Sequence, residues 1–302
     1  MYDLIIVGGG PAGLTAAIYA IRKRLNVLLI SKDLGGKTNY HLELPDQEKH
    51  QVIRGVDVVE RFRRELEYLD FARHMEPVER VVHNDDGTFT IHTKDGGELY
   101  ARAVIVATGS RQQWMDVPGE REYLSKGLCY SAMSYAPLFI DKQTVVIGDG
   151  ELALRSAGEL ATVAEHVHLV GPSGPVLETP LGQKLLRAEN VTILQNHRVA
   201  QVMGNGYCNR VVVTSPVGEE LELAADGTFV ELNLVANTSM VTGLVDVDDQ
   251  GRIKIDCYNR TNVPGLFAAG DVTSIYAEQV LVAVGEGAKA ALSAYDYLLP
   301  YL

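Results

Sequence analysis

The chain is 302 residues long, carries a net charge of −12, and is 46% hydrophobic and 22% charged. This length is sufficient for two domains with their own cores, and the composition is that of an ordinary globular protein. The negative charge argues against nucleic acid or an anionic membrane surface as the main partner, and no apolar run approaches membrane-spanning length. Because the chain enters its first apolar run without a preceding basic segment, we expect a cytoplasmic protein.

The first thirty residues predict a strand, a glycine turn, a helix and a second strand. An apolar run at 4–7 leads into Gly-Gly-Gly-Pro-Ala-Gly at 8–13, helix formers follow, and 26–30 is apolar again. This order is typical of a dinucleotide-binding unit, whose glycines permit the turn, admit a pyrophosphate and let helix and strand pack closely. The phosphates would lie on free N–H groups where the helix begins. The predicted contacts are Gly8, Gly10, Pro11, Ala12 and Gly13.

A polar loop follows the second strand. Its first residue is Ser31, where a carboxylate commonly holds the ribose hydroxyls. The loop's place just beyond a nucleotide-binding strand favours ligand contact over a plain connector. The predicted contacts in this loop are Ser31, Lys32, Gly35, Gly36, Lys37, Thr38 and Asn39.

The order of elements then repeats. Residues 56–71 have helical spacing of apolar side chains, and a buried strand at 103–107 closes the first unit. A second strand and glycine turn follow at 144–150, then a helix through Leu160, a strand at 166–170, and a hairpin turn at Asn205-Gly206. This internal repeat supports nucleotide binding more strongly than either glycine motif alone. The residues predicted for the second nucleotide site are Gly148, Gly150, Glu151, Leu152 and Ala153.

The C-terminal segment returns to the pattern of the first unit. Residues 262–271 predict a strand that ends in Gly270-Asp271, and a helix rich in small residues begins near Glu278. A carboxylate directly after a buried strand suits a cofactor hydroxyl, and the alternative is a helix cap.

These motifs together resemble the low-molecular-weight thioredoxin reductase flavoproteins, pyridine nucleotide-disulfide oxidoreductases of class II. The matching segments are 8–13, 35–36, 107–109, 261–271, 279 and 288–292. The resemblance implies an α/β fold with two Rossmann-like, three-layer ββα dinucleotide-binding domains. It implies an FAD-binding domain of residues 1–113 and 243–302, an inserted NAD(P)-binding-like domain of residues 114–242, and a homodimer.

The resemblance also implies roles for single residues. Asp271 would hold the FAD ribityl chain, and the helix start at Gln279 and Val280 would face the flavin ring, where N–H groups stabilise negative charge. The remaining FAD contacts expected on this basis are Ala107, Thr108, Gly109, Gly270 and Glu278.

Two departures from the family bear on function. The family's Cys-x-x-Cys pair is replaced here by Ser131 and Ser134, and Tyr135 stands where the family has a proton-transferring acid. Hydroxyls cannot form a redox disulfide, so thioredoxin reduction with NADPH by the family mechanism is disfavoured. These three residues are flavin-facing candidates, and the catalytic residues are otherwise unassigned.

The second departure concerns the inserted domain. The strand at 166–170 ends without the family's basic cluster for a 2′-phosphate, and Asn233 replaces a glycine. NAD(P)H and a second flavin both remain alternatives at this site. His166 and His168 share one face of a strand but lack further ligands, so we expect no metal site.

The leading hypothesis is an FAD-dependent oxidoreductase that moves electrons between its flavin and a partner other than a Cys-x-x-Cys disulfide. That partner would be a nicotinamide, a ferredoxin-like protein or a second flavin. The alternative is a non-catalytic flavin-binding redox sensor or partner protein.

Overall fold

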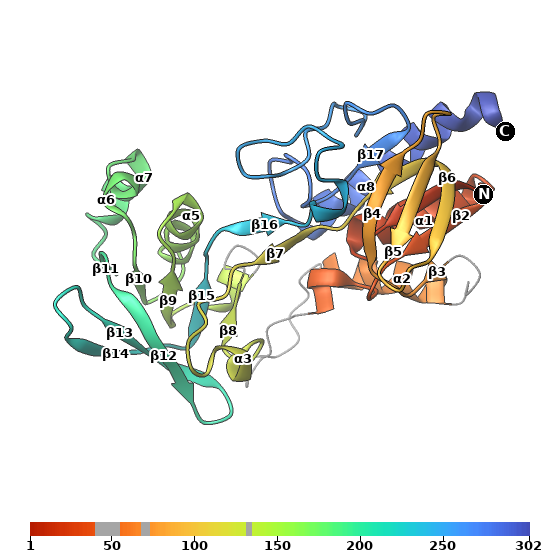
Figure 1. Cartoon of the computed structure of the whole chain (residues 1–302). Coiled ribbons are helices and arrows are strands. Elements are labelled where there is room, and N and C mark those ends of the chain that lie inside the picture. Colours follow the sequence, from red (N-terminus) through yellow and green to blue (C-terminus); the bar gives the residue numbers. More distant parts are fainter. Residues whose placement is uncertain (40–54, 68–72, 131–134) are drawn as a thin grey trace. The chain divides into compact units, whose positions relative to one another are not determined.

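The computed structural model describes residues 1–39, 55–67, 73–130 and 135–302. These residues divide into two compact units (Figure 1). The first contains the described residues up to 111 together with 235–302, and the second contains those of 112–234. The chain crosses between the units through β7 (Ser110–Gln112) and β16 (Leu234–Ala236), which pair with each other.

The first unit is built on a mostly parallel sheet. Its strands are β1 (Tyr2–Val7), β2 (Val27–Ile30), β3 (Arg73–His74), β4 (Val78–His83), β5 (Phe89–Thr93), β6 (Glu98–Val106) and β17 (Leu266–Ala268). Their order is β3-β2-β1-β6-β5-β4, and β17 pairs in parallel with the end of β6 (Figure 1). β4 and β5 form an antiparallel hairpin beside the first half of β6.

The strands at the centre of this sheet are buried on both faces. Leu4 and Ile6 of β1 pack in the core formed with α1 (Pro11–Arg22) and α8 (Val280–Leu298), whereas Ile5 and Val7 pack in the core on the opposite face. Successive side chains of a strand point to opposite faces, so an all-apolar run is what such a strand requires. α2 (Gly55–Glu67) contributes Val59 to the first of these cores.

Small residues let α1 and α8 approach closely. A Cβ atom on Gly287 of α8 would overlap the carbonyl oxygen of Ala12, and one on Gly270 would lie 3.0 Å from the Ala12 Cβ. This close packing brings the last segment of the chain beside the first glycine turn.

The second unit repeats the parallel arrangement. Its sheet has the order β11-β10-β9-β15-β8, and all of its pairings are parallel. The strands are β8 (Leu128–Cys129), β9 (Gln143–Ile147), β10 (His166–Val170), β11 (Val191–Leu194) and β15 (Gly227–Val230). A separate antiparallel sheet holds β12 (Arg198–Gly204), β13 (Cys208–Thr214) and β14 (Glu220–Ala224). The helices of the unit are α3 (Glu120–Tyr123), α5 (Glu151–Leu160), α6 (Gly174–Leu177) and α7 (Pro180–Leu185).

The repeated strand–turn–helix–strand order is confirmed, as β1-α1-β2 and as β9-α5-β10. The hairpin predicted at Asn205-Gly206 is also confirmed, because β12 and β13 pair antiparallel around it. The helix predicted at 56–71 is α2 over Gly55–Glu67, and the predicted end at Phe71 lies outside the described residues. Within the part of the chain that the structure describes, no helix is long and apolar enough to cross a membrane.

Candidate functional site

The first glycine turn joins β1 to α1 at the carboxyl edge of the sheet. Gly8 has φ +114°, a conformation that favours glycine, and a Cβ atom there would overlap the Ala107 carbonyl group. A Cβ atom on Gly13 would overlap the Gly8 carbonyl oxygen, which shows why helix and strand can pack so closely here. Gly10 is the N-cap of α1, makes no side-chain cap bond, and faces no atom within 4 Å of its Cβ position. The turn therefore presents N–H groups and the positive helix end to open space, as pyrophosphate binding requires.

The loop after β2 is attached to this turn. The Gly9 N–H group donates to the Ser31 hydroxyl at 2.9 Å, and the Gly35 N–H group donates to the Gly9 carbonyl oxygen at 2.7 Å. The Ser31 hydroxyl in turn donates to the Asp33 carbonyl oxygen at 2.6 Å. Ser31 thus fixes the loop against the turn, a role that its sequence position alone did not indicate.

The short 3-10 helix η1 (Gly36–Asn39) completes the loop. A Cβ atom on Gly36 would lie 3.2 Å from the Gly10 Cα, so η1 lies directly over the start of α1. The Thr38 hydroxyl donates to the Gly35 carbonyl oxygen at 2.7 Å, and the Asn39 amide donates to the Leu34 carbonyl oxygen at 3.0 Å. Two of the predicted contact residues therefore have side chains engaged within the loop itself.

The segment after β6 lies beside the same turn. The Thr108 hydroxyl donates to the Asn237 carbonyl oxygen at 2.7 Å, and the Asn237 side-chain amide donates to the Thr108 carbonyl oxygen at 3.0 Å. Gly109 has φ +66° and open space at its Cβ position. Sequence reasoning missed Asn237, since no periodicity or motif connects it to a residue 129 positions earlier.

A cluster of charged side chains lies beside these segments, and it comprises Lys37, Asp271, Glu278 and Ser110. The Lys37 ammonium nitrogen is 2.7 Å from Asp271 Oδ2, 3.5 Å from Glu278 Oε2 and 2.9 Å from the Ser110 hydroxyl. Burial raises the pKa of Glu278, and the charge of Lys37 opposes this effect. The helix cap proposed as the alternative for Asp271 is wrong, because Gln279 is the N-cap of α8 and Asp271 pairs with Lys37.

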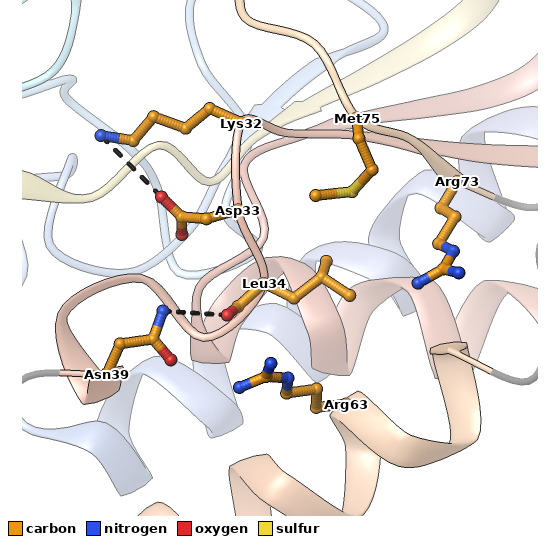
Figure 2. A pocket seen from close by; sticks show the side chains of 7 residues that line it. All are labelled: Lys32, Asp33, Leu34, Asn39, Arg63, Arg73 and Met75. Atoms are coloured by element: carbon orange, nitrogen blue, oxygen red, sulfur yellow. Dashed lines mark hydrogen bonds and ion pairs between the residues drawn. The ribbon is translucent and has the colours of Figure 1, made fainter.

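A cavity of about 650 Å³ opens beyond the carboxyl end of β2 (Figure 2). Figure 2 shows the guanidinium groups of Arg63 and Arg73 around the side chain of Leu34, with Met75 on the same side. Lys32, Asp33 and Asn39 supply the rest of the lining. The cavity lies where the adenosine end of a dinucleotide meets the second strand. Sequence reasoning missed Arg63, Arg73 and Met75, because a helix surface and a two-residue strand carry no recognisable motif.

The second glycine turn has the same backbone form. Gly150 is the N-cap of α5, again without a side-chain cap bond and with open space at its Cβ position. A Cβ atom on Gly148 would overlap the Glu231 carbonyl oxygen and lie 2.7 Å from the Ala153 Cβ. Around this turn, the Ser173 hydroxyl donates to the Asp149 carbonyl oxygen at 2.9 Å. Of the other predicted residues, Glu151 and Leu152 lie in the first turn of α5.

The predicted flavin-facing residues are placed only in part. Ser131 and Ser134 lie outside the described residues, and Tyr135 packs against the core of the second unit. The cysteines Cys129, Cys208 and Cys257 are free, and the first two are buried, as expected for Cys129. The rings of His166 and His168 lie 4.7 Å apart, and no group of three potential ligands for a metal ion occurs among the described residues.

The comparisons with known proteins agree with this geometry. The family model of the pyridine nucleotide-disulphide oxidoreductases matches residues 2–287. The chain belongs to this family. It is 37% identical over 314 residues to an alkyl hydroperoxide reductase of Escherichia coli K12, covering 99% of the chain and 58% of that protein. It is 32% identical over 302 residues to an NADH dehydrogenase of Bacillus subtilis, covering 99% of the chain and 59% of that protein.

The solved structures give the fold of the whole chain. Thioredoxin reductase from Streptococcus pyogenes matches with a TM-score of 0.87 and 30% identity, over 99% of this chain and 98% of that one. The thioredoxin reductase-like α/β fold with two dinucleotide-binding domains is therefore confirmed. The chain is an oxidoreductase of this family with FAD as its cofactor. It spans less than two thirds of the length of the curated relatives it matches.

Proposed function

We propose that this chain passes electrons between an FAD held at the first glycine turn and a redox partner other than a cysteine pair of its own. The carrying observation is the first turn itself, whose open N–H groups, attached loop and neighbouring carboxylate fit a flavin dinucleotide. The three cysteines are free and far apart in sequence, so the chain offers no disulfide relay of the Cys-x-x-Cys type.

The binding roles follow from where each segment lies. The start of α1 would take the pyrophosphate, and the cavity lined by Arg63 and Arg73 would take the adenosine end. Asp271 would accept a hydroxyl of the ribityl chain, and the start of α8 would face the ring. FAD supplies the two-electron chemistry when bound. The protein's part is to orient it and to set the charge around it.

The electron donor is proposed from the second unit. The second turn keeps an open helix N-terminus, so a phosphate-bearing donor such as a nicotinamide is compatible with its backbone. The similarity to an NADH dehydrogenase favours NADH among the nicotinamides. A ferredoxin-like protein and a second flavin are the other donors consistent with the sequence.

Rapid anaerobic mixing tests the proposal. The yellow protein is mixed separately with NADH, NADPH and reduced ferredoxin while the absorbance of the oxidised flavin is followed. Fast bleaching by one of them identifies the donor and supports an enzyme. If none bleaches the flavin, the oxidoreductase proposal fails for these donors and the redox-sensor alternative takes its place. The number and identity of the flavins released by heat would then show whether a second flavin occupies the chain.

We also propose that the working form is a homodimer, as the resemblance to thioredoxin reductases implies. Light scattering during size-exclusion chromatography measures this directly. A mass equal to that of one 32.9 kDa chain would overturn it.

A further inference from the structure

One lysine connects three segments of the first unit that are far apart in sequence. Lys37 lies in η1, Asp271 follows β17, and Glu278 precedes α8. All three side chains are at least partly buried, with exposed fractions of 34% for Lys37, 14% for Asp271 and 28% for Glu278. An ion pair in such surroundings is held more rigidly than a surface pair, because water competes less for its groups.

The hydrogen-bond capacity of Lys37 is fully used within this cluster. Its ammonium group has three N–H donors, and three oxygen atoms lie within 3.5 Å of it, those of Asp271, Glu278 and Ser110. The position of the nitrogen is therefore fixed from three directions. A flexible side chain would otherwise hold its partner only loosely.

Asp271 is engaged through one oxygen only. Oδ2 lies 2.7 Å from Lys37, whereas no bond to Oδ1 is described for the residues that the structure places. A carboxylate accepts through both oxygens, so Oδ1 remains available to a hydroxyl donor while Lys37 holds the group in place. Since Gly270 packs against Ala12 of the phosphate-binding turn, this oxygen belongs to the same site as the turn.

Glu278 has a different task from Asp271. The charges that act on it are those of Lys37, Asp271 and Arg252, and its burial raises the pKa of its carboxyl group. Of the two carboxylates around the lysine, Glu278 lies farther from the ammonium nitrogen, at 3.5 Å against 2.7 Å. Asp271 is therefore the principal partner of Lys37, and Glu278 completes its fixation.

We propose that Lys37 is a positioning residue of the flavin site, which holds one oxygen of Asp271 so that the other can accept a ribityl hydroxyl of FAD. This inference rests on the proposed placement of FAD at the first turn. Without the ammonium group, Asp271 and Glu278 would face each other as two adjacent carboxylates. The Asp271 carboxyl would then shift or take up a proton, and a hydrogen bond to a charged acceptor would be lost.

The test is a double-mutant cycle on FAD affinity with Lys37→Met and Asp271→Asn. Each single variant should bind FAD about 10- to 100-fold more weakly, the range for one hydrogen bond to a charged group. In the double variant, the second change should add less than about threefold, because Lys37 acts through Asp271. Independent, multiplying effects would overturn the proposal.

A second ligand separates positioning from general stability. ADP has the pyrophosphate but no ribityl chain, so Lys37→Met should leave the affinity of the flavin-free protein for ADP unchanged while FAD affinity falls. An equal loss for both ligands would mean that Lys37 only supports the fold. Lys37→Arg should recover part of the FAD affinity, and Lys94→Met, an exposed lysine of the same unit, should bind FAD like the parent chain.

The proposal and the function on which it rests fail in different ways. A parent chain that binds no FAD overturns the placement of FAD itself. A parent chain that binds FAD, with Lys37→Met binding it equally well, overturns the inference alone. The flavin content of the proteins as purified gives the same comparison without removal of the cofactor.

Discussion

The two glycine turns of this chain have nearly the same backbone and very different surroundings. In both, the N-cap glycine of the following helix lacks a side-chain cap and faces open space. Around the first turn, however, an attached loop, a lysine and a cavity with two arginines supply groups that can recognise a dinucleotide. Around the second, Arg155 pairs with Glu151 on α5 at 2.8 Å. A glycine turn therefore provides a place for phosphates, and the segments packed around it decide which nucleotide binds.

The largest expected effect separates the two turns directly. Gly10→Val puts a branched side chain into the space where the pyrophosphate must pass, so this variant should be purified without flavin. The matched change Gly150→Val fills the equivalent space of the second unit and should leave the first flavin in place. Flavin absorbance relative to protein absorbance measures both. A yellow Gly10→Val protein would contradict the placement of FAD.

The next effect concerns the missing disulfide relay. Because Ser131 and Ser134 cannot form a disulfide, the chain should give no thioredoxin reduction with NADPH above the rate without enzyme. Thioredoxin-coupled turnover by the parent chain would refute this. A weaker companion prediction is that Ser131→Cys with Ser134→Cys introduces a disulfide that the flavin can reduce, provided that both side chains come within bonding distance.

A third effect concerns the nucleotide preference of the second turn. A 2′-phosphate without cationic partners loses charge-assisted hydrogen bonds of roughly 1.5–3 kcal/mol each. Two such bonds correspond to about two to four decades in affinity. NADPH should therefore bind no better than NADH, and both weakly, in titration calorimetry.

Arg155 is the matched variant for this measurement, because it lies on α5 and is held by Glu151. Arg155→Ala should leave both affinities unchanged. A micromolar preference for NADPH that is lost in Arg155→Ala would show that this cation binds the phosphate instead of pairing with Glu151.

The smallest effect concerns charge at the first turn. The pKa of Glu278 is raised above its ordinary value of 4.5, mainly by burial. The stability that this group contributes is complete below the ordinary pKa and is lost as the pH rises through the raised value. Glu278→Gln removes this loss, so its melting temperature relative to the parent chain should increase from about pH 4 to about pH 8. A difference that is constant or falls with pH would contradict the assignment, and Glu79→Gln, on the exposed surface of β4, is the control.

Sequence patterns predicted the backbone of this protein well. Apolar runs bounded by glycine turns marked β1 and β9, and the helices after them begin where the glycines end. These features are local, because a tight turn and a helix start depend on a few adjacent residues. The repeat of the pattern then indicated two dinucleotide-binding units before any tertiary contact was known.

The sequence by itself determined the two nucleotide turns, their helices and the absence of a Cys-x-x-Cys pair. Only the tertiary structure decided the surroundings of the first turn: the Asn237–Thr108 bonds, the arginines of the cavity, and the pairing of Lys37 with Asp271 and Glu278. The partners in these contacts are up to 241 residues apart, and a charged residue in a loop has no periodicity that would reveal its partner. Close packing of α8 on α1 brings them together, because small residues along that contact let the two ends of the chain meet at one site.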